Sequence, residues 1–284
     1  MIPLEDLLRF IREDAPWGDA TTDAVVPDVT CRAVVRANES GVIAGLAEAK
    51  ALFEHFGVRV RARTADGRPV TSGEILLDLD GPARGVLLVE RTALNIIGRM
   101  GGIATRTREA VDAVRGVSPD VRVAATRKTV PGLRALDKKA VVLGGGDPHR
   151  HTLSDMILIK DNHLALVPLP EAIRRAKEVS LYRLIEVEVE TTDDAITAAG
   201  VGADIILLDN MTPDTVRETV RALSGQGLRE RVILEVSGGI SGDDLAGYAS
   251  TGIDVISMGA LTHTVRNFDV SLDILKGMST VRVL

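Results

Sequence analysis

One stretch decides the fold of this 284-residue chain: Met156-Ile157-Leu158-Ile159-Lys160-Asp161-Asn162. A short apolar run of strand length is followed at once by polar residues. Five other runs have the same form, at 121–126, 184–187, 205–208, 232–234 and 255–258. Helix-length stretches separate them, which predicts repeated βα units. The parallel strands of such units end on one face, where a (β/α) barrel keeps its active site.

The residues that follow each run suit an anionic ligand. They are Arg127 and Lys128; Lys160, Asp161 and Asn162; Glu188 and Glu190; Asp209 and Asn210; Ser237, Gly238 and Gly239; and Gly259 and Ala260. Six strands are evident where a closed barrel has eight, so we predict an α/β fold with an incomplete (β/α) TIM-like barrel.

The N-terminal third has a different pattern. Strand-like stretches at 33–37, 58–63 and 75–79, with a helical segment near 46–56, predict an α+β sandwich domain over residues 1–102. The barrel domain then takes 103–266, and the tail 267–284 is a candidate to rejoin the first domain. Helical periodicity at 83–100 and 104–114, split by Gly101-Gly102, predicts two helices with a hinge between the domains.

Composition narrows the class of protein. The N-terminus places Leu4, Leu7, Leu8 and Ile11 at helical spacing among acids, unlike a signal peptide, and no stretch resembles a transmembrane span. Cys31 is the single cysteine, which fits a reducing compartment. We therefore expect a cytoplasmic protein without a membrane partner.

Charge points to a small anionic ligand. The net charge of −6 and an aromatic content of 2% argue against nucleic-acid binding. Residues 127–160 nevertheless hold seven Lys/Arg against three acids. A local positive pocket in an acidic protein indicates a small anion.

The basic candidates each have a simpler interpretation. Arg127 and Lys128 could hold a carboxylate and a phosphate, or form a solvated strand end. The glycines at 144–146 could bring amides to an anion beside His149 and Arg150, or form a flexible turn with a structural histidine. Lys160 could bind substrate, form a Schiff base, or pair with Asp161 or Glu188.

The acidic and glycine-rich candidates follow the later runs. Glu186, Glu188 and Glu190 alternate along one strand, so they share one face of the sheet. Burying a glutamate that points inward without a cationic partner costs folding free energy. This favours a function for Glu188. The same argument applies to Asp209, which follows the next apolar run. Glycines 238, 239 and 259 suit phosphate binding, or merely permit tight turns.

Together these residues resemble quinolinate phosphoribosyltransferase over nearly the whole chain. The motifs that carry the resemblance are Gly18-Asp19-Ala20-Thr21-Thr22, Glu90-Arg91-Thr92-Ala93-Leu94-Asn95, Gly102-Ile103-Ala104-Thr105, Thr126-Arg127-Lys128-Thr129-Val130-Pro131-Gly132-Leu133-Arg134, Gly144-Gly145-Gly146 with His149-Arg150, Ile159-Lys160-Asp161-Asn162-His163, Glu186-Val187-Glu188-Val189, Leu207-Leu208-Asp209-Asn210 and Ser237-Gly238-Gly239-Ile240.

The resemblance implies an activity and a set of site residues. The activity is conversion of quinolinate and 5-phosphoribosyl 1-pyrophosphate to nicotinate mononucleotide, CO2 and pyrophosphate, in de novo NAD biosynthesis. The resemblance also implies a homodimer, or a larger assembly of dimers, in which Arg91 enters the partner's site. The substrate-binding residues implied are Thr126, Arg127, Lys128, His149, Arg150 and Lys160, with Glu188 and Asp209 facing the ribose and Mg²⁺, and Ser237, Gly238, Gly239, Gly259 and Ala260 at the 5-phosphate.

Lys128, Lys160, Glu188 and Asp209 are the expected catalytic residues. Two departures from the family pattern are visible. Ala125 stands where many members have Asp, and Val142 where many have Arg. Both resemble a molybdenum-transport-associated paralogue, a phosphoribosyltransferase of another substrate, whereas 160–163 is of the quinolinate type. A Schiff-base lyase on the same barrel and a catalytically silent nucleotide-binding protein are two further hypotheses.

Overall fold

The chain divides into two compact units. The computed structural model describes residues 2–242, 244–275 and 280–281. The first unit comprises Met1–Arg106, Ala135–Gly145 and Val265–Leu284, and the second Thr107–Arg134 and Gly146–Thr264. The tail that follows the barrel pattern therefore belongs to the first unit.

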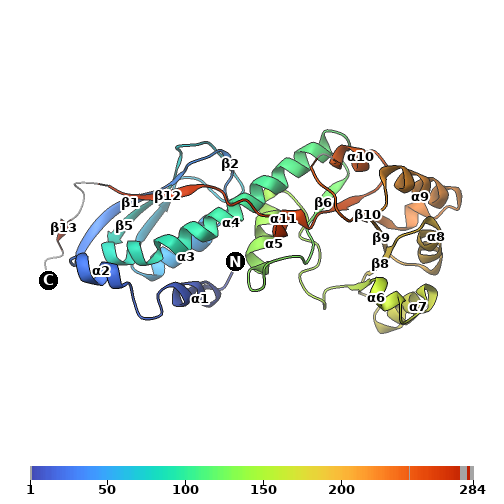
Figure 1. Ribbon diagram of the computed structural model, residues 1–284, viewed down its shortest axis with the longest axis horizontal. Coiled ribbons are helices and arrows are strands. Elements are labelled where there is room, and N and C mark those ends of the chain that lie inside the picture. The colour runs from blue at the N-terminus through green and yellow to red at the C-terminus, as the bar shows by residue number, and fades with distance from the viewer. Residues whose placement is uncertain (1, 243, 276–279, 282–284) are drawn as a thin grey trace. The chain divides into compact units, whose positions relative to one another are not determined.

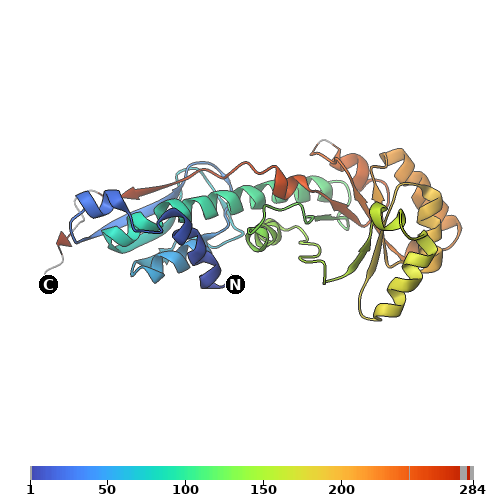
Figure 2. The same ribbon diagram turned by 60° about the horizontal axis from the view of Figure 1, so that its bottom comes forward.

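The first unit contains an antiparallel sheet with helices on one side (Figures 1 and 2). The strand order is β12 (Val270–Ile274), β1 (Val29–Ala37), β5 (Ile75–Pro82) and β3 (Arg59–Ala62), and β13 (Thr280–Val281) also pairs with β1. Strands β2 (Gly41–Val42) and β4 (Pro69–Val70) form a small second sheet. The helices are α1 (Leu4–Asp14), α2 (Ala20–Val25), α3 (Leu46–His55) and the first part of α4 (Ala83–Arg115). This α+β layer confirms the fold class predicted for the N-terminal third.

The Gly18–Thr22 motif is explained by local structure. Asp19 is the N-cap of α2, and its Oδ1 accepts hydrogen bonds from the amides of Thr21 and Thr22, each at 3.1 Å. Such a cap satisfies amides that lack a partner inside the helix. The Thr22 hydroxyl also donates to the Asp19 carboxylate. This bond has the largest effect on the pKa of Asp19 and, together with the amide bonds, holds it below its usual value.

The prediction of two helices split at Gly101-Gly102 was wrong, because α4 runs unbroken from Ala83 to Arg115. The two glycines serve close packing instead. A Cβ at Gly101 would lie 2.9 Å from Cβ of Phe268, and one at Gly102 would overlap the carbonyl of Arg266. The returning chain thus passes directly over the helix backbone, where only glycine fits.

Helix α5 (Arg134–Gly144) differs from the predicted domain division, since residues 135–145 pack with the first unit rather than the barrel. Arg99 donates two hydrogen bonds to the fully buried Asp137, at 2.7 and 2.8 Å, and Lys139 pairs with Glu48 at 2.6 Å. These ion pairs join stretches far apart in sequence, which local patterns do not reveal.

The second unit is built on a parallel sheet that follows the predicted runs. Its strand order is β6 (Arg122–Ala124), β11 (Val255–Ser257), β10 (Ile233–Ser237), β9 (Ile205–Asp209), β8 (Ile185–Val189) and β7 (Ile157–Ile159). Strands β6 and β7 are the two edges of this six-stranded sheet. The incomplete barrel is therefore confirmed.

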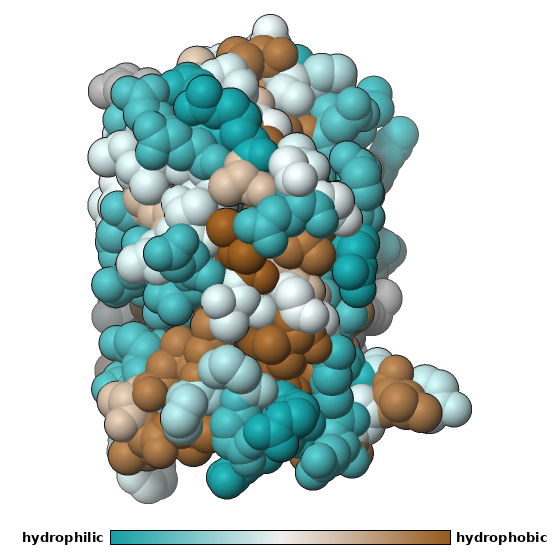
Figure 3. All heavy atoms as spheres, turned by 90° about the vertical axis from the view of Figure 1, so that its right-hand side faces the viewer, coloured by the Kyte–Doolittle hydropathy of each residue, from teal (hydrophilic) through white to brown (hydrophobic). Residues whose placement is uncertain are grey.

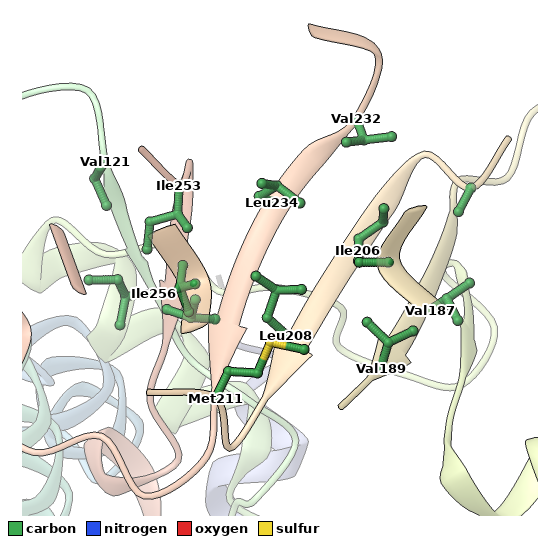
Figure 4. Close-up of a cluster of buried hydrophobic side chains, with 14 of the residues drawn as sticks. Val121, Val187, Val189, Ile206, Leu208, Met211, Val232, Leu234, Ile253 and Ile256 are labelled. Carbon is green, nitrogen blue, oxygen red and sulfur yellow. The ribbon is translucent and has the colours of Figure 1, made fainter. Parts of the chain in front are cut away.

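Helices cover the outer face of the sheet and bury its core. They are α7 (Leu169–Val179), α8 (Thr192–Val201), α9 (Pro213–Gly225) and α10 (Leu245–Ala249). The unit also contains the last part of α4, the short helices α6 (Asp161–Leu164) and α11 (Ala260–His263), and the 3-10 helix η1 (Arg229–Arg231). Figure 4 shows apolar side chains from successive strands, such as Val187, Leu208 and Leu234, meeting in this core. Because side chains alternate along a strand, the residues between these face the barrel interior.

None of the helices in the described part of the chain has the length and apolar character needed to cross a bilayer.

Candidate active site

The charged residues predicted at the strand ends of the second unit are brought together by the parallel sheet. All six strands run in the same direction, so their C-terminal ends lie along one edge. Thr126, Arg127 and Lys128 follow β6, where the Thr126 hydroxyl accepts from the Lys128 amide at 3.1 Å. The Thr262 hydroxyl donates to the Lys128 carbonyl at 2.8 Å and ties this end to α11.

Two arginines act on each other electrostatically at this edge. Burial lowers the pKa of the Arg150 guanidinium, and the positive charge of Arg127 lowers it further, while Glu186 and Asp155 oppose these effects. The buried Arg127 Nε has no hydrogen-bond partner within the described residues. An anion bound beside both guanidinium groups would offset this repulsion.

His149 points away from solvent, toward two glutamates. Its Nε2 lies 3.3 Å from Glu186 Oε2 and 3.6 Å from Glu235 Oε2, and the ring is 14% exposed. Burial is the largest influence on the pKa of His149 and lowers it, but contact with these carboxylates and their charges outweighs burial and raises it to about 9. Burial also raises the pKa of Glu186.

The other ring nitrogen limits where the proton can be. The amide of Arg150 donates to His149 Nδ1 at 2.7 Å, which requires a lone pair there, whereas a pKa near 9 indicates a ring protonated on both nitrogens. A second N–H on Nδ1 would meet the Arg150 amide head on, so the hydrogen bond favours the ring with its single proton on Nε2. In both states Nε2 carries a proton, and this is the atom that faces the carboxylates.

Glu186 and Glu235 were not among the predicted site residues. Glu186 on β8 is 0% exposed and Glu235 on β10 is 3% exposed. Within the described residues, neither oxygen of Glu186 nor Oε1 of Glu235 has a well-formed hydrogen bond. A sequence signal was present, since a glutamate in the middle of a short apolar strand is unusual. Its partner could not be read from sequence.

Lys160 contacts Glu188 across neighbouring strands. Lys160 follows β7, Glu188 lies on β8, and their side chains form an ion pair. The Lys160 side chain is 42% exposed and that of Glu188 is 13% exposed. The Lys160 amide donates to His163 Nδ1 at 2.9 Å, so the start of α6 fixes the backbone beneath the ammonium. Of the three roles considered for Lys160, the structural pairing with Glu188 is the one observed.

Asp209 ends β9 beside this pair. Burial raises the pKa of Asp209, and the charge of Glu188 raises it further, while Lys160 and Lys128 lower it. The side-chain amide of Asn210 donates to Asp209 Oδ2 at 2.6 Å. Two carboxylates and two lysines therefore act on each other at the same edge. Carboxylate oxygens are hard ligands that suit Mg²⁺, so Glu188 and Asp209 fit the predicted metal.

The predicted phosphate loops are close to these charges. Gly238 has φ of +101°, and a Cβ there would overlap the Asn210 side chain and lie 2.8 Å from its amide nitrogen. Asn210 is itself left-handed, with φ of +53°. The turn after β10 therefore packs directly on the turn after β9. Only a residue without a side chain can occupy Gly238.

Gly259 brings the end of β11 against the end of β6. A Cβ at Gly259 would lie 2.9 Å from Lys128 Cδ and 3.0 Å from His263 Nε2. Sequence reasoning missed His263, which lies one helical turn after Gly259 and Ala260. The spacing was a usable signal, because residues three and four apart share a helix face.

Three predicted positions lie in the first unit or in the core. Arg91 is an exposed residue of α4 in the first unit, and Val142 is exposed on α5. Ala125 is fully buried, and its amide donates to the Asp147 carbonyl at 2.9 Å. Ala125 therefore lies at the end of β6, buried directly before Thr126 and Arg127, whereas Val142 lies in the other unit.

Comparison with known families decides the relationship. The profile described as "Quinolinate phosphoribosyl transferase, C-terminal domain" matches residues 103–273, and the corresponding N-terminal domain matches residues 19–101. This chain belongs to the quinolinate phosphoribosyltransferase family. The resemblance carried by the sequence motifs is thereby confirmed.

Full-length relatives of this phosphoribosyltransferase agree. It is 46% identical to the probable nicotinate-nucleotide pyrophosphorylase (carboxylating) of Methanothermobacter thermautotrophicus, covering 95% of this chain and 98% of that protein. It is 44% identical to the nicotinate-nucleotide pyrophosphorylase (carboxylating) of Mycobacterium leprae, covering 95% and 96%. The crystal structure of nicotinate-nucleotide pyrophosphorylase from Ehrlichia chaffeensis matches with a TM-score of 0.90 and 32% identity, covering 95% and 98%.

Proposed function

We propose that this phosphoribosyltransferase is a nicotinate-nucleotide pyrophosphorylase (carboxylating). It converts quinolinate and 5-phosphoribosyl 1-pyrophosphate to nicotinate mononucleotide, CO2 and pyrophosphate, in de novo NAD biosynthesis. One observation carries the proposal beyond family membership. The positive charge of Arg127 acts on the Arg150 guanidinium, and a substrate with two carboxylates on adjacent ring carbons would bring negative charge to both.

The residues divide between the two substrates. Arg127 and Arg150, together with Thr126 and Lys160, bind the pyridine dicarboxylate. Ser237, Gly238, Gly239, Gly259 and Ala260 bind the 5-phosphate through backbone amides. Lys128 lies beside Gly259, so its ammonium is available to the phosphate charges of the donor. His263, which also borders Gly259, adds a second basic side chain at this loop.

The reaction has two steps. As pyrophosphate leaves ribose C1, positive charge develops on the sugar, and Glu188 and Asp209 stabilise it electrostatically. The pyridine nitrogen forms the new bond to C1 and becomes cationic. The neighbouring ring carbon then loses CO2, because the electron pair left behind lies beside that positive charge. A proton completes this carbon, and Lys128 or Lys160 is suited to supply it.

Magnesium is the cofactor we propose. Glu188 and Asp209 would hold it, directly or through the donor, and when bound it supplies positive charge that stabilises the leaving pyrophosphate. Lys160 already pairs with Glu188. The lysine therefore restrains the carboxylate and neutralises part of the negative charge that a metal ion would otherwise balance.

We further propose a homodimer or an assembly of dimers, in the cytoplasm. Exposed apolar side chains support an interface: Trp17 in the first unit is 96% exposed, and in the second Leu166 is 85%, Leu181 95% and Tyr182 98% exposed. Figure 3, which shows the right-hand side of Figure 1, has apolar residues gathered in the lower part of that face. Arg91 would enter the partner's site. The free, buried Cys31 supports a reducing compartment.

The Schiff-base lyase is less well supported. A lysine that attacks a carbonyl must be uncharged, which active sites achieve by apolar surroundings or a neighbouring cation. Lys160 instead contacts a carboxylate. Borohydride trapping with a carbonyl substrate tests this hypothesis, since a transferase is not trapped.

The direct test is incubation with quinolinate, 5-phosphoribosyl 1-pyrophosphate and Mg²⁺. Nicotinate mononucleotide and CO2 should form in equal amounts. Formation of neither product from quinolinate by a folded protein would refute the proposal.

A further inference from the structure

The cluster of His149, Glu186 and Glu235 lies inside the barrel and has no part in the proposed reaction. Its ligand atoms lie within 4.8 Å of one another, and both glutamates are almost completely buried. Two carboxylates with unsatisfied oxygens are costly inside a protein and call for an explanation. A metal ion and a positioning role are the two candidates.

A metal ion is disfavoured by the histidine itself. A histidine that binds a metal through Nε2 must present a lone pair there. The Arg150 amide occupies the lone pair of Nδ1, at 2.7 Å, which leaves the proton on Nε2. The nitrogen that faces the glutamates therefore donates rather than coordinates. Arg150 also supplies positive charge to Glu186.

The backbone at His149 shows what the cluster holds in place. His149 has φ of +54°, a left-handed conformation that only a few per cent of residues other than glycine adopt, histidine more often than most. Its amide donates to Asp147 Oδ1 at 2.8 Å, and its ring accepts from the next amide. The ring and both neighbouring peptides are thus tied together by hydrogen bonds in one turn. Arg150 follows His149 directly, so this turn fixes the position of the Arg150 backbone.

We propose that Glu186 and Glu235 are positioning residues, which hold the His149 ring in the barrel interior and so fix the backbone of Arg150, whose guanidinium binds a substrate carboxylate. His149 then acts as an internal anchor for the turn that carries Arg150. The proposal rests on quinolinate as the substrate. It assigns recognition of one substrate carboxylate to the turn at His149 and Arg150, which Glu186 and Glu235 hold in place from the barrel interior.

Binding measurements on the whole protein test this role. Glu235→Gln and Glu186→Gln should each weaken quinolinate binding about tenfold or more, as expected when an aligned charged contact is lost. Affinity for 5-phosphoribosyl 1-pyrophosphate should stay within about twofold of wild type, because its proposed binding residues do not include Arg150. Glu235→Asp, which keeps the charge, should retain more quinolinate affinity than Glu235→Gln.

A double-mutant cycle identifies Arg150 as the intermediary. In an Arg150→Ala background, Glu235→Gln should have almost no further effect on quinolinate binding, because the residue it positions is gone. Glu48→Gln is the matched control, since Glu48 is equally buried but lies in the other unit. Additive effects in the cycle, or equal loss for both substrates, would overturn the proposal.

A measurement on the ring separates this proposal from the proposed function. In ¹⁵N spectra of the free enzyme, His149 Nε2 should be protonated, and Glu186→Gln should shift its signal. An unprotonated Nε2, or one that loses its proton when Zn²⁺ is added, would establish the metal site instead. Failure of wild type to bind quinolinate would refute the substrate, while the ring signal would still report on the anchor.

Discussion

Lys160 and Glu188 form an ion pair between the ends of two neighbouring strands, β7 and β8, with Glu188 the more buried partner. Each charge therefore restrains the other before any substrate arrives. Within the described residues, Arg127 forms no ion pair with a carboxylate, and its buried Nε has no hydrogen-bond partner. The site thus combines one balanced pair with a surplus of positive charge, which is the arrangement expected of a pocket for anionic substrates.

Removing either of these cations should abolish most turnover. For Arg127→Ala and Lys160→Ala, we expect loss of a desolvated contact worth roughly 2 to 5 kcal/mol of binding. The thermal unfolding midpoint should change little, because both residues end strands rather than fill the core. Lys50→Ala, at an exposed surface pair with Glu54, is the control. Steady-state kinetics near wild type would remove the altered residue from the site.

The two acids should matter more for chemistry than for quinolinate binding. Glu188→Gln and Asp209→Asn remove charge that counts most when the ribose becomes cationic. Single-turnover rates and quinolinate dissociation constants, measured in parallel, test this difference. Asp214→Asn, at an exposed position in the same unit, should leave both unchanged. An unchanged rate with lost binding would reverse the assignment.

A methyl group at Gly238 should damage the phosphate loop. Gly238→Ala combines a left-handed backbone with overlap against Asn210, and the strain alone is of order 1 to 3 kcal/mol. We expect a raised KM for 5-phosphoribosyl 1-pyrophosphate and a lowered melting temperature. Gly200→Ala, in helix α8 with open space around it, should be neutral or stabilising. Wild-type behaviour of Gly238→Ala would contradict the packing of these two turns.

Arg91 provides a test of subunit sharing. An exposed arginine on a helix is ordinarily worth little, but the proposed dimer brings it to the partner's site. Mixing inactive Arg91→Ala and Lys128→Ala subunits should restore activity, because each mixed dimer contains one intact site. Absence of recovery after verified subunit exchange would count against sharing.

Features that depend on the alternation of neighbouring residues could be predicted from the sequence. The alternation of Glu186, Val187, Glu188 and Val189 indicated an inward and an outward face, and Val187 and Val189 do lie in the outer core while Glu186 is interior. The six strand positions follow for the same reason. The cap at Asp19 is equally local, because the amides it accepts from belong to Thr21 and Thr22.

Features that depend on distant chain segments were not readable. Gly101 and Gly102 suggested a helix break, since glycine disfavours helices by about 1 kcal/mol. The reason for them is Phe268 and Arg266, far along the chain. Glu235 lies just past the predicted run 232–234. Its role depends on His149, which only the barrel geometry brings near.

Competition between quinolinate and nicotinate at equal concentration, with limiting 5-phosphoribosyl 1-pyrophosphate, tests the central claim most directly. Nicotinate lacks the carboxylate next to the ring nitrogen, so it brings one negative charge fewer to the guanidiniums of Arg127 and Arg150. Charged groups that a ligand fails to match give large discrimination, and we predict a preference for quinolinate on the order of a hundredfold or more. Comparable use of nicotinate would contradict the account and indicate a phosphoribosyltransferase that does not decarboxylate its substrate.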